Sequence, residues 1–407
     1  RPGYKLTEVG VIPDGWDTSR LSDIAELTSS KRIFEHDYVP AGIPFYIGKE
    51  ISLLMSRKAI EDPYFIAEER FNEIKQQFGA PKIGDILITA VGTLGNIFVV
   101  NSDMKFYFKD GNLIWLRGIN SADSNYIGAQ LNKYKSKILD GAIGSSQKAL
   151  TIVVLKELQV PIAPLLEQRA IAEALSDMDV LISGLDQLIA KKRDIKQATM
   201  QQLLAGQQRL PGFSGEWEMK RFAELATPRK DRVDPRKSGE ELFCIELEHI
   251  DQGTGRLLGN TTTSAQSSLK SIFKPGDVLF GKLRAYLRKF WLADCHGVCS
   301  TEIWPLIANR NLTTPEFLIQ LIKDDCFIEA ASTAYGTHMP RSDWNVIKNY
   351  EVRTPSIAEQ TAIATILSDM DSELAAHEIH RDKAYQLKLG VMQELLTGRI
   401  RLGISSS

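Results

Sequence analysis

The sequence lacks several features that mark specialised classes of protein. Only four cysteines occur in 407 residues, which is too few for a disulfide framework. No apolar run approaches the roughly 18 residues of a membrane span, and no apolar stretch near the first residue resembles a signal peptide. The 49 Lys and Arg nearly balance the 51 Asp and Glu, so electrostatic binding must come from local patches. We expect a reduced, cytoplasmic protein with no membrane segment.

Complete motifs for catalysis or metal binding are also missing. Residues 276–282 fit the first seven positions of a phosphate-binding loop, but Leu283 stands where the Mg²⁺-binding Ser or Thr belongs. Cys295, His296 and Cys299 lie close together, yet no second pair of ligands has the spacing of a structural zinc site. We therefore predict that the chain is not itself an enzyme and binds no metal.

What the sequence does contain is a second copy of itself. Residues 167–179 return as residues 359–371, an offset of 192 residues (359 − 167). The same offset relates Gly84-Asp85 to Gly276-Asp277, and Arg209-Leu210 to Arg401-Leu402. A period of this length is too long for a solenoid and predicts two homologous domains, each followed by the same extension.

Each extension is predicted to be a long helix. Apolar residues recur at alternating steps of four and three, which is the seam of a coiled coil. Pro164 and Ser356 are start signals, and Gly206 and Gly398 stand where C-terminal caps are expected. The predicted seam and partner-docking residues are Ile171, Leu175, Met178, Ile182, Leu185 and Ile189 in the first copy, and Ile363, Leu367, Met370 and Leu374 in the second.

The remaining segments form two bodies in which short strand-like apolar runs alternate with turn signals. One helix is predicted late in each body, around residues 126–139 and 315–331. We predict an α+β fold, with two homologous, mostly β bodies separated by an antiparallel coiled coil of two long helices in a pseudo-two-fold arrangement. The predicted bodies are residues 1–163 and 209–354, and the helical regions are residues 164–208 and 355–407.

Basic and polar residues gather in loops at corresponding ends of both bodies. Such side chains suit phosphate neutralisation and hydrogen bonding to base edges. For any one residue, a solvated strand edge protected by Lys or Arg is an equally good interpretation. The candidates for DNA binding are Lys31, Arg32, Thr93, Asn96, Ser145, Ser146, Gln147 and Lys148 in the first body, and Lys230, Arg232, Lys282, Arg284, Tyr286, Arg288, Thr337, His338 and Arg341 in the second.

Residues 165–172 (LLEQRAIA) and their echo at 357–364 (IAEQTAIA) resemble the conserved helical regions of the DNA specificity subunit of type I restriction–modification systems. Residues 276–284 (GDVLFGKLR) and 336–341 (GTHMPR) resemble its target recognition domains. The resemblance covers essentially the whole chain. It implies that each body reads one half of a split target in double-stranded DNA, and that the helices set the spacing and dock two methyltransferase subunits.

The resemblance also implies that the chemistry belongs to partner subunits. S-adenosylmethionine, ATP and Mg²⁺ are expected on the methyltransferase and on the restriction and translocase subunits, with no cofactor on this chain. Three alternatives remain open. They are a related system in which one partner both methylates and cleaves, a scaffold that binds no nucleic acid, and a nucleotide-binding enzyme built on the imperfect phosphate loop.

Overall fold

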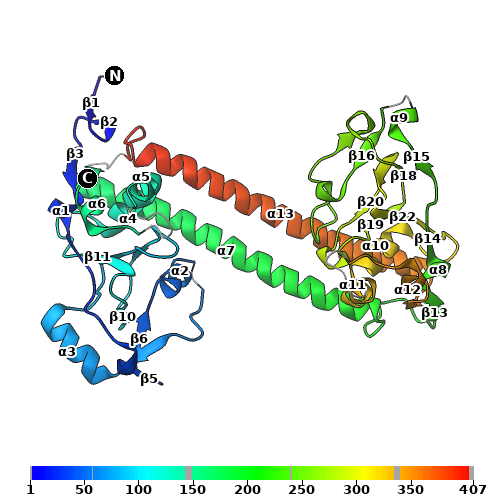
Figure 1. Ribbon diagram of the computed structural model, residues 1–407, viewed down its shortest axis with the longest axis horizontal. Helices are drawn as coiled ribbons and strands as arrows, with labels where there is room; N and C mark the ends of the chain where they lie inside the picture. The colour runs from blue at the N-terminus through cyan, green and yellow to red at the C-terminus, as the bar shows by residue number, and fades with distance from the viewer. Residues whose placement is uncertain (1, 57, 143–148, 239–240, 334–339, 403–407) are drawn as a thin grey trace. The chain divides into compact units, whose positions relative to one another are not determined.

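The computed structural model describes residues 2–56, 58–142, 149–238, 241–333 and 340–402, and the chain divides into two compact units (Figure 1). Unit 1 comprises Arg1–Asp186 and His380–Ser407, and unit 2 comprises Gln187–Ile379. Each unit therefore holds one of the predicted bodies together with part of both long helices. Among the described residues, no helix is long and apolar enough to cross a membrane.

The body of unit 1 consists of short strands and helices. Its strands are β1 (Tyr4–Thr7), β2 (Gly10–Pro13), β3 (Asp17–Arg20), β4 (Glu26–Thr28), β5 (Tyr38–Val39), β6 (Ile43–Tyr46), β7 (Tyr64–Ile66), β8 (Ile86–Thr89), β9 (Ile97–Val99), β10 (Tyr107–Phe108), β11 (Leu113–Arg117) and β12 (Gln159–Ile162). Its helices are α1 (Leu21–Ile24), η1 (Glu35–Asp37), α2 (Lys49–Met55), α3 (Glu68–Phe78), α4 (Ser124–Lys133), α5 (Lys135–Asp140) and α6 (Ile152–Lys156).

The body of unit 2 is built in the same way. Its strands are β13 (Glu218–Arg221), β14 (Ala226–Pro228), β15 (Arg232–Val233), β16 (Phe243–Ile245), β17 (Thr261–Thr262), β18 (Lys270–Phe273), β19 (Val278–Gly281), β20 (Phe290–Leu292), β21 (Gly297–Ser300), β22 (Ile303–Ala308) and β23 (Glu351–Thr354). Its helices are α8 (Phe222–Leu225), α9 (Pro235–Ser238), η2 (Leu247–His249), η3 (Thr263–Ala265), η4 (Ala285–Leu287), α10 (Pro315–Lys323), α11 (Asp325–Ser332) and α12 (Trp344–Ile347).

The two bodies share a four-stranded antiparallel sheet and a two-stranded one, which is β3-β12 in unit 1 and β13-β23 in unit 2, and they differ in a further sheet, which we call the second sheet. The shared four-stranded sheet has the order β4-β11-β8-β9 in unit 1 and β14-β22-β19-β20 in unit 2. The second sheet has four strands in unit 1, in the order β10-β6-β7-β5, and five in unit 2, in the order β15-β18-β21-β16-β17. The repeat thus preserves the sheet against which α4 and α10 pack, while the second sheet has diverged.

The repeated Gly-Asp pair forms a turn that leads into a buried strand. Gly84 and Gly276 both have positive φ, at 91° and 85°. The following carboxylates accept hydrogen bonds from the backbone N–H groups of Lys82 and Lys274, at 3.0 and 2.9 Å, and so fix the turns. The strands that follow, β8 and β19, are buried at every position. The partial match to a phosphate-binding loop at 276–282 is therefore a turn and a core strand.

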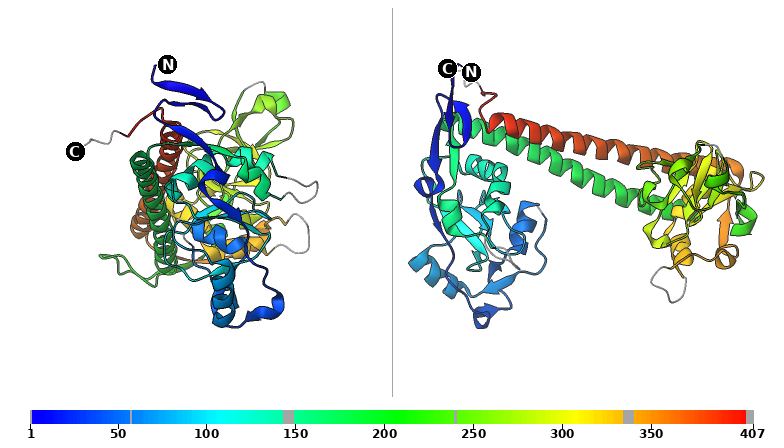
Figure 2. Two further views of the ribbon diagram at one scale, coloured as in Figure 1. Left: turned by 90° about the vertical axis from the view of Figure 1, so that its left-hand side faces the viewer. Right: turned by 45° about the horizontal axis from the view of Figure 1, so that its top comes forward.

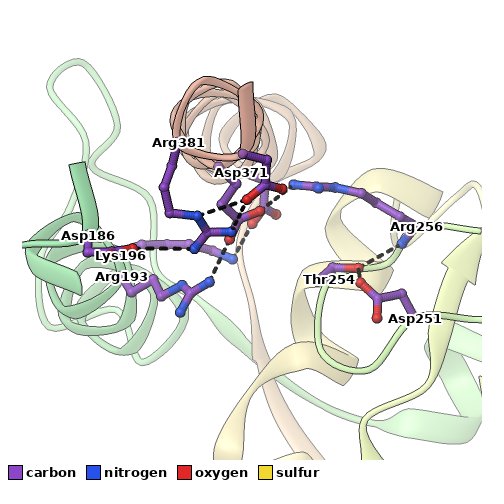
Figure 3. Close-up of polar contacts among 10 residues, drawn as sticks. Asp186, Arg193, Lys196, Asp251, Thr254, Arg256, Asp371 and Arg381 are labelled. Carbon is purple, nitrogen blue, oxygen red and sulfur yellow. Dashed lines mark hydrogen bonds and ion pairs between the residues drawn. The ribbon is translucent and has the colours of Figure 1, made fainter. Parts of the chain in front are cut away.

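The two long helices are α7 (Leu165–Leu204) and α13 (Ile357–Leu395). With 40 and 39 residues, each is about 60 Å long. Within each unit the two helices run antiparallel, as ion pairs between them show (Figure 3). In unit 1, Asp179 pairs with Lys388 and Asp186 with Arg381. In unit 2 the pairs are Arg193–Glu378 and Lys196–Asp371.

The residues of the predicted seam are buried or half-buried. Leu185, Ile189 and Leu374 are buried, and Met178, Ile182 and Met370 are half-buried. The predicted seam residues at the start of each helix also pack into the cores of the bodies. These residues are Ile171 and Leu175 in unit 1, and Ile363 and Leu367 in unit 2.

A three-residue clamp joins each body to both helices. In unit 1 the buried carboxylate of Glu167, in the first turn of α7, accepts hydrogen bonds from Trp16 Nε1 at 3.0 Å and from Arg401 Nη2 at 2.7 Å. The Arg401 guanidinium also lies 5.8 Å from the centre of the Trp16 ring. Because Arg401 follows α13, the clamp fastens the body to the start of one helix and the end of the other.

Unit 2 repeats the clamp at the equivalent positions. Glu359, in the first turn of α13, accepts from Trp217 Nε1 at 3.1 Å and from Arg209 Nε and Nη2 at 2.6 and 2.8 Å. The cap glycines predicted from the sequence are confirmed, with φ of 67° at Gly206 and 65° at Gly398. A Cβ atom at Gly398 would lie 2.4 Å from Pro13, so glycine is needed there to let the body approach.

The glutamine beside each clamp glutamate fastens a body helix. Gln168 accepts from the backbone N–H of Asp123 at 2.8 Å, and Gln360 accepts from that of Thr314 at 3.2 Å. Asp123 and Thr314 are the N-caps of α4 and α10. The identical Glu-Gln pairs in the sequence repeat are therefore explained by equivalent contacts in the two units.

The first strand of the chain lies against the segment that follows α13, within unit 1. The hydroxyl of Tyr4, in β1, donates a hydrogen bond to the backbone oxygen of Gly398 at 3.1 Å. Figure 2 shows the β1–β2 hairpin beside the end of α13. The first and last described segments therefore belong to the same compact structure.

Candidate nucleic-acid interface

Three predicted DNA-binding residues of unit 2 surround one pocket. The side chains of Lys230, Arg232 and Lys282, which we call the pocket cations, line a cavity of about 500 Å³. They come from the segment after β14, from β15 and from the segment after β19. None of the three side chains has a hydrogen bond or ion pair with another residue in the described part of the chain. Their charge is available to a bound anion.

Two aromatic side chains also line the pocket. Trp304 of β22 and Trp344 of α12 line it, with ring centres 5.6 Å apart and ring planes nearly perpendicular. Both side chains are half-buried. Unpaired cations around aromatic rings suit a nucleotide chain, because the cations neutralise phosphates while the rings contact sugars or bases.

A fourth cation at the pocket is already neutralised. Arg229 donates to both carboxylate oxygens of Asp277, at 2.8 and 2.9 Å, and this hydrogen bonding raises the pKa of Arg229. The equivalent carboxylate in unit 1, Asp85, instead accepts from Trp115 Nε1 at 2.9 Å, and burial raises its pKa. The same turn is thus stabilised by an arginine in unit 2 and by a tryptophan in unit 1.

Two other predicted residues of unit 2, Arg288 and Arg341, have partners within the protein. Arg288 donates to the Asp325 carboxylate and to the backbone oxygen of Lys323, at 3.2 Å for the latter. Arg341 forms an ion pair with Glu302 at 2.8 Å. Tyr286 is about half exposed, at 49%, on η4.

The described candidates of unit 1 also have protein partners. Arg32 pairs with Asp110 at 2.9 Å, and the Lys31 ammonium lies 4.8 Å from the centre of the Phe78 ring. Asn96 donates to Ser52 Oγ and accepts from Lys135 Nζ, both at 2.9 Å. The backbone oxygen of Thr93 accepts from the Thr89 hydroxyl, so Thr93 and Asn96 help to shape the loop between β8 and β9.

Six candidates lie outside the described residues. They are Ser145, Ser146, Gln147 and Lys148 in the first body, and Thr337 and His338 in the second.

Neither Trp304 nor Trp344 is among the site residues predicted from the sequence. Trp344 follows the candidate Arg341 by three positions, but Trp304 carries no signal except its place in a strand. The sequence cannot show that the strand and the short helix present both rings to the same cavity, because this contact depends on how distant segments pack.

Two free thiols of unit 2 are buried in its second sheet. Cys244 and Cys299 lie in the paired strands β16 and β21, and all four cysteines are free. Burial raises the pKa of Cys244 to about 11 and raises that of Cys299 further still. Burial therefore favours the protonated thiol at both positions.

Comparison with known proteins identifies the repeated domain. The family model described as "Type I restriction modification DNA specificity domain" matches residues 13–192 and again residues 215–383. A protein described as "Putative type I restriction enzyme MjaX specificity subunit", from Methanocaldococcus jannaschii, is 28% identical over 98% of this chain and 97% of its own length. The type I restriction enzyme EcoDI specificity subunit of Escherichia coli is 28% identical over 38% of this chain and 34% of its own length.

Solved structures share the fold. The S subunit of a type I restriction–modification system from M. genitalium aligns with a TM-score of 0.61 at 16% identity, over 97% of this chain and 98% of that one. A chain from a study of complex assembly and conformational transition of the type I R-M system aligns with a TM-score of 0.55 at 16% identity, over 96% and 99%. The two matches to the family model cover most of the sequence. This chain belongs to the type I restriction modification DNA specificity domain family and carries that domain twice.

Proposed function

We propose that this chain is the DNA specificity subunit of a type I restriction–modification complex, and that each body reads one half of a split target in double-stranded DNA. The observation that carries the proposal is the duplicated unit, with a shared sheet and clamp but a different second sheet in each copy. Two readers on equivalent supports suit a two-part target, and their divergence suits two different half-sites. The unpaired pocket cations supply the phosphate-binding charge of the second reader.

In this proposal the chain binds and its partners catalyse. Two methyltransferase subunits would hold S-adenosylmethionine, and restriction and translocase subunits would hold ATP and Mg²⁺. The complex would act on DNA in the cytoplasm. This division of labour agrees with the incomplete catalytic motifs in the sequence and with the core-strand role of residues 276–282.

The long helices are the proposed docking and spacing elements. α7 and α13 each contribute residues to both units. The length of these helices would therefore set the spacing between the two readers. Large apolar side chains remain exposed on both helices, and a partner surface can cover them. These side chains are Val180, Leu181 and Ile195 on α7, and Ile379, Tyr385, Leu387 and Leu389 on α13.

The test is a genome-wide map of modified bases in a host that carries the partner subunits, with and without this chain. A split motif that appears only with the chain supports the proposal, and an unchanged map refutes it. Gel-shift experiments with a random duplex pool, with and without the methyltransferase subunits, separate a DNA reader from a scaffold. A scaffold would give no shifted duplex in either condition.

A further inference from the structure

The loop between β8 and β9 and the loop between β19 and β20 are equivalent. β8 pairs with β9 up to Ile88–Ile97, and β19 pairs with β20 up to Phe280–Phe290. The first loop therefore spans residues 89–96 and the second spans residues 281–289, one residue longer. Both follow the repeated Gly-Asp turn and its buried strand.

Both loops pass through the left-handed backbone region twice, but with different residues. In unit 1 the two positions are Gly92, with φ of 77°, and Gly95, with φ of 70°. In unit 2 they are Arg284, with φ of 53°, and Arg288, with φ of 51°. In the described part of the chain, every other residue with positive φ is glycine. Any residue with a Cβ atom pays an energetic penalty in this conformation.

The contacts of Arg288 explain its presence. Its guanidinium binds the carboxylate of Asp325 and the backbone oxygen of Lys323, which fastens the loop to the α10–α11 junction. Asp325 also accepts from Gln197 of α7 at 2.6 Å. The arginine thus stabilises the body and its attachment to the helix, which offsets the backbone penalty.

Arg284 has no such contacts. Its backbone N–H donates to the oxygen of Pro340 at 2.8 Å, and its backbone oxygen accepts from Leu287, so the main chain is held at both ends of the residue. Its side-chain Nε, however, is shielded from solvent without a hydrogen-bond partner, and its guanidinium forms no ion pair with any described residue. For folding alone, the glycine found at the equivalent position of unit 1 would be the better residue.

We propose that Arg284 is a specificity-determining residue of the second reader, and that its guanidinium hydrogen-bonds the major-groove edge of a guanine in that half-site. This inference rests on the proposed function. Arg284 lies two residues after the pocket cation Lys282, in the same loop. A forked donor on a fixed backbone matches the two acceptors, O6 and N7, that guanine presents in the groove.

The test compares three substitutions in the chain bound to its partner subunits, namely Arg284→Gly, Arg284→Ala and Arg284→Lys. Binding is measured against duplexes in which each base pair of the second half-site is changed in turn, and thermal unfolding is recorded in parallel. All three variants should lose discrimination at one G·C pair by roughly 5- to 150-fold and keep their preference in the first half-site. Arg284→Gly should melt above Arg284→Ala, because only glycine removes the backbone penalty.

The matched control is Arg310→Ala, which removes an exposed cation before α10 and should leave discrimination unchanged. An equal loss of affinity for every duplex, restored by Arg284→Lys, would mean a phosphate contact and would overturn the inference. Unchanged discrimination in all three variants would also overturn it. If the wild-type complex itself recognises no split motif, the proposed function fails, which is a separate outcome.

Discussion

Replacing Arg209 by alanine should destabilise unit 2 because it leaves a buried carboxylate without its counter-charge. Glu359 is 2% exposed and the Arg209 side chain 29% exposed. Breaking a buried ion pair by removing one partner typically costs 3–5 kcal/mol. The partial exposure of Arg209 and the remaining hydrogen bond from Trp217 place the expected loss at the lower end, about 3 kcal/mol.

The equivalent change in unit 1, Arg401→Ala, should lower the free energy of unfolding by a smaller amount. The Arg401 side chain is 43% exposed, so solvent already screens more of its interaction with Glu167. We expect a loss of about 2 kcal/mol, confined to unit 1. The loss of stability should therefore be larger for Arg209→Ala than for Arg401→Ala, because the Arg209 side chain is less exposed.

The double variant Arg209→Ala with Glu359→Gln provides the decisive comparison. Removing the buried charge together with its partner should recover part of the loss, because the amide can still accept from Trp217 and no unpaired charge remains. Hydrogen exchange read by mass spectrometry, resolved along the chain, measures the local stability of each unit. The reasoning is refuted if the double variant exchanges as fast as Arg209→Ala, or if the effect of Arg209→Ala appears equally in unit 1.

Replacing the three pocket cations by alanine should weaken binding similarly for all duplexes and reduce the salt slope by up to about three, as competition binding at several salt concentrations would show; an unchanged slope would exclude phosphate contacts. Inserting seven residues into each long helix at the unit boundary, after Asp186 and after Ile379, should add about 10 Å of helix while keeping the seam in register. The preferred gap between half-sites should then lengthen by roughly three base pairs in a methylation map, and a constant gap would refute the spacing role. Burial, with a smaller contribution from Arg399, lowers the pKa of Lys133 from its ordinary value of 10.5 to about 8. Because the unfolded chain binds this proton more tightly, unit 1 should gain stability as the pH rises from about 8 to 10.5, and Lys133→Met should abolish that part of the slope in pH-dependent unfolding.

The repeat made it possible to predict that the contacts between the bodies and the long helices are equivalent in the two units. The residues that recur at the offset of 192 include Glu167, Gln168 and Arg401, and their contacts in unit 1 are those of their counterparts in unit 2. The long helices and their cap glycines followed from local periodicity and turn chemistry, which depend on neighbours in the sequence.

The binding surface was less predictable because partners of charged residues come from distant segments. Arg32 finds Asp110, and Asn96 finds Ser52, across intervals that no spacing rule covers. The sequence also gave no indication that Arg284 adopts a glycine-like backbone. The equivalence of Arg284 with a glycine of unit 1 can be seen only once the strand register of both hairpins is known.

The duplicated clamp gives the chain two equivalent sites at which a body is attached to the long helices. At each site the same three residue types, a tryptophan, a glutamate and an arginine, attach the body, and these contacts do not depend on which residues occupy the loops of that body. A new body that keeps the tryptophan can replace an old one without any change in the helices, because the glutamate and the arginine belong to the long helices and the segments that directly follow them. Sequence preference can therefore evolve one half at a time, while the exposed surface of the long helices stays constant.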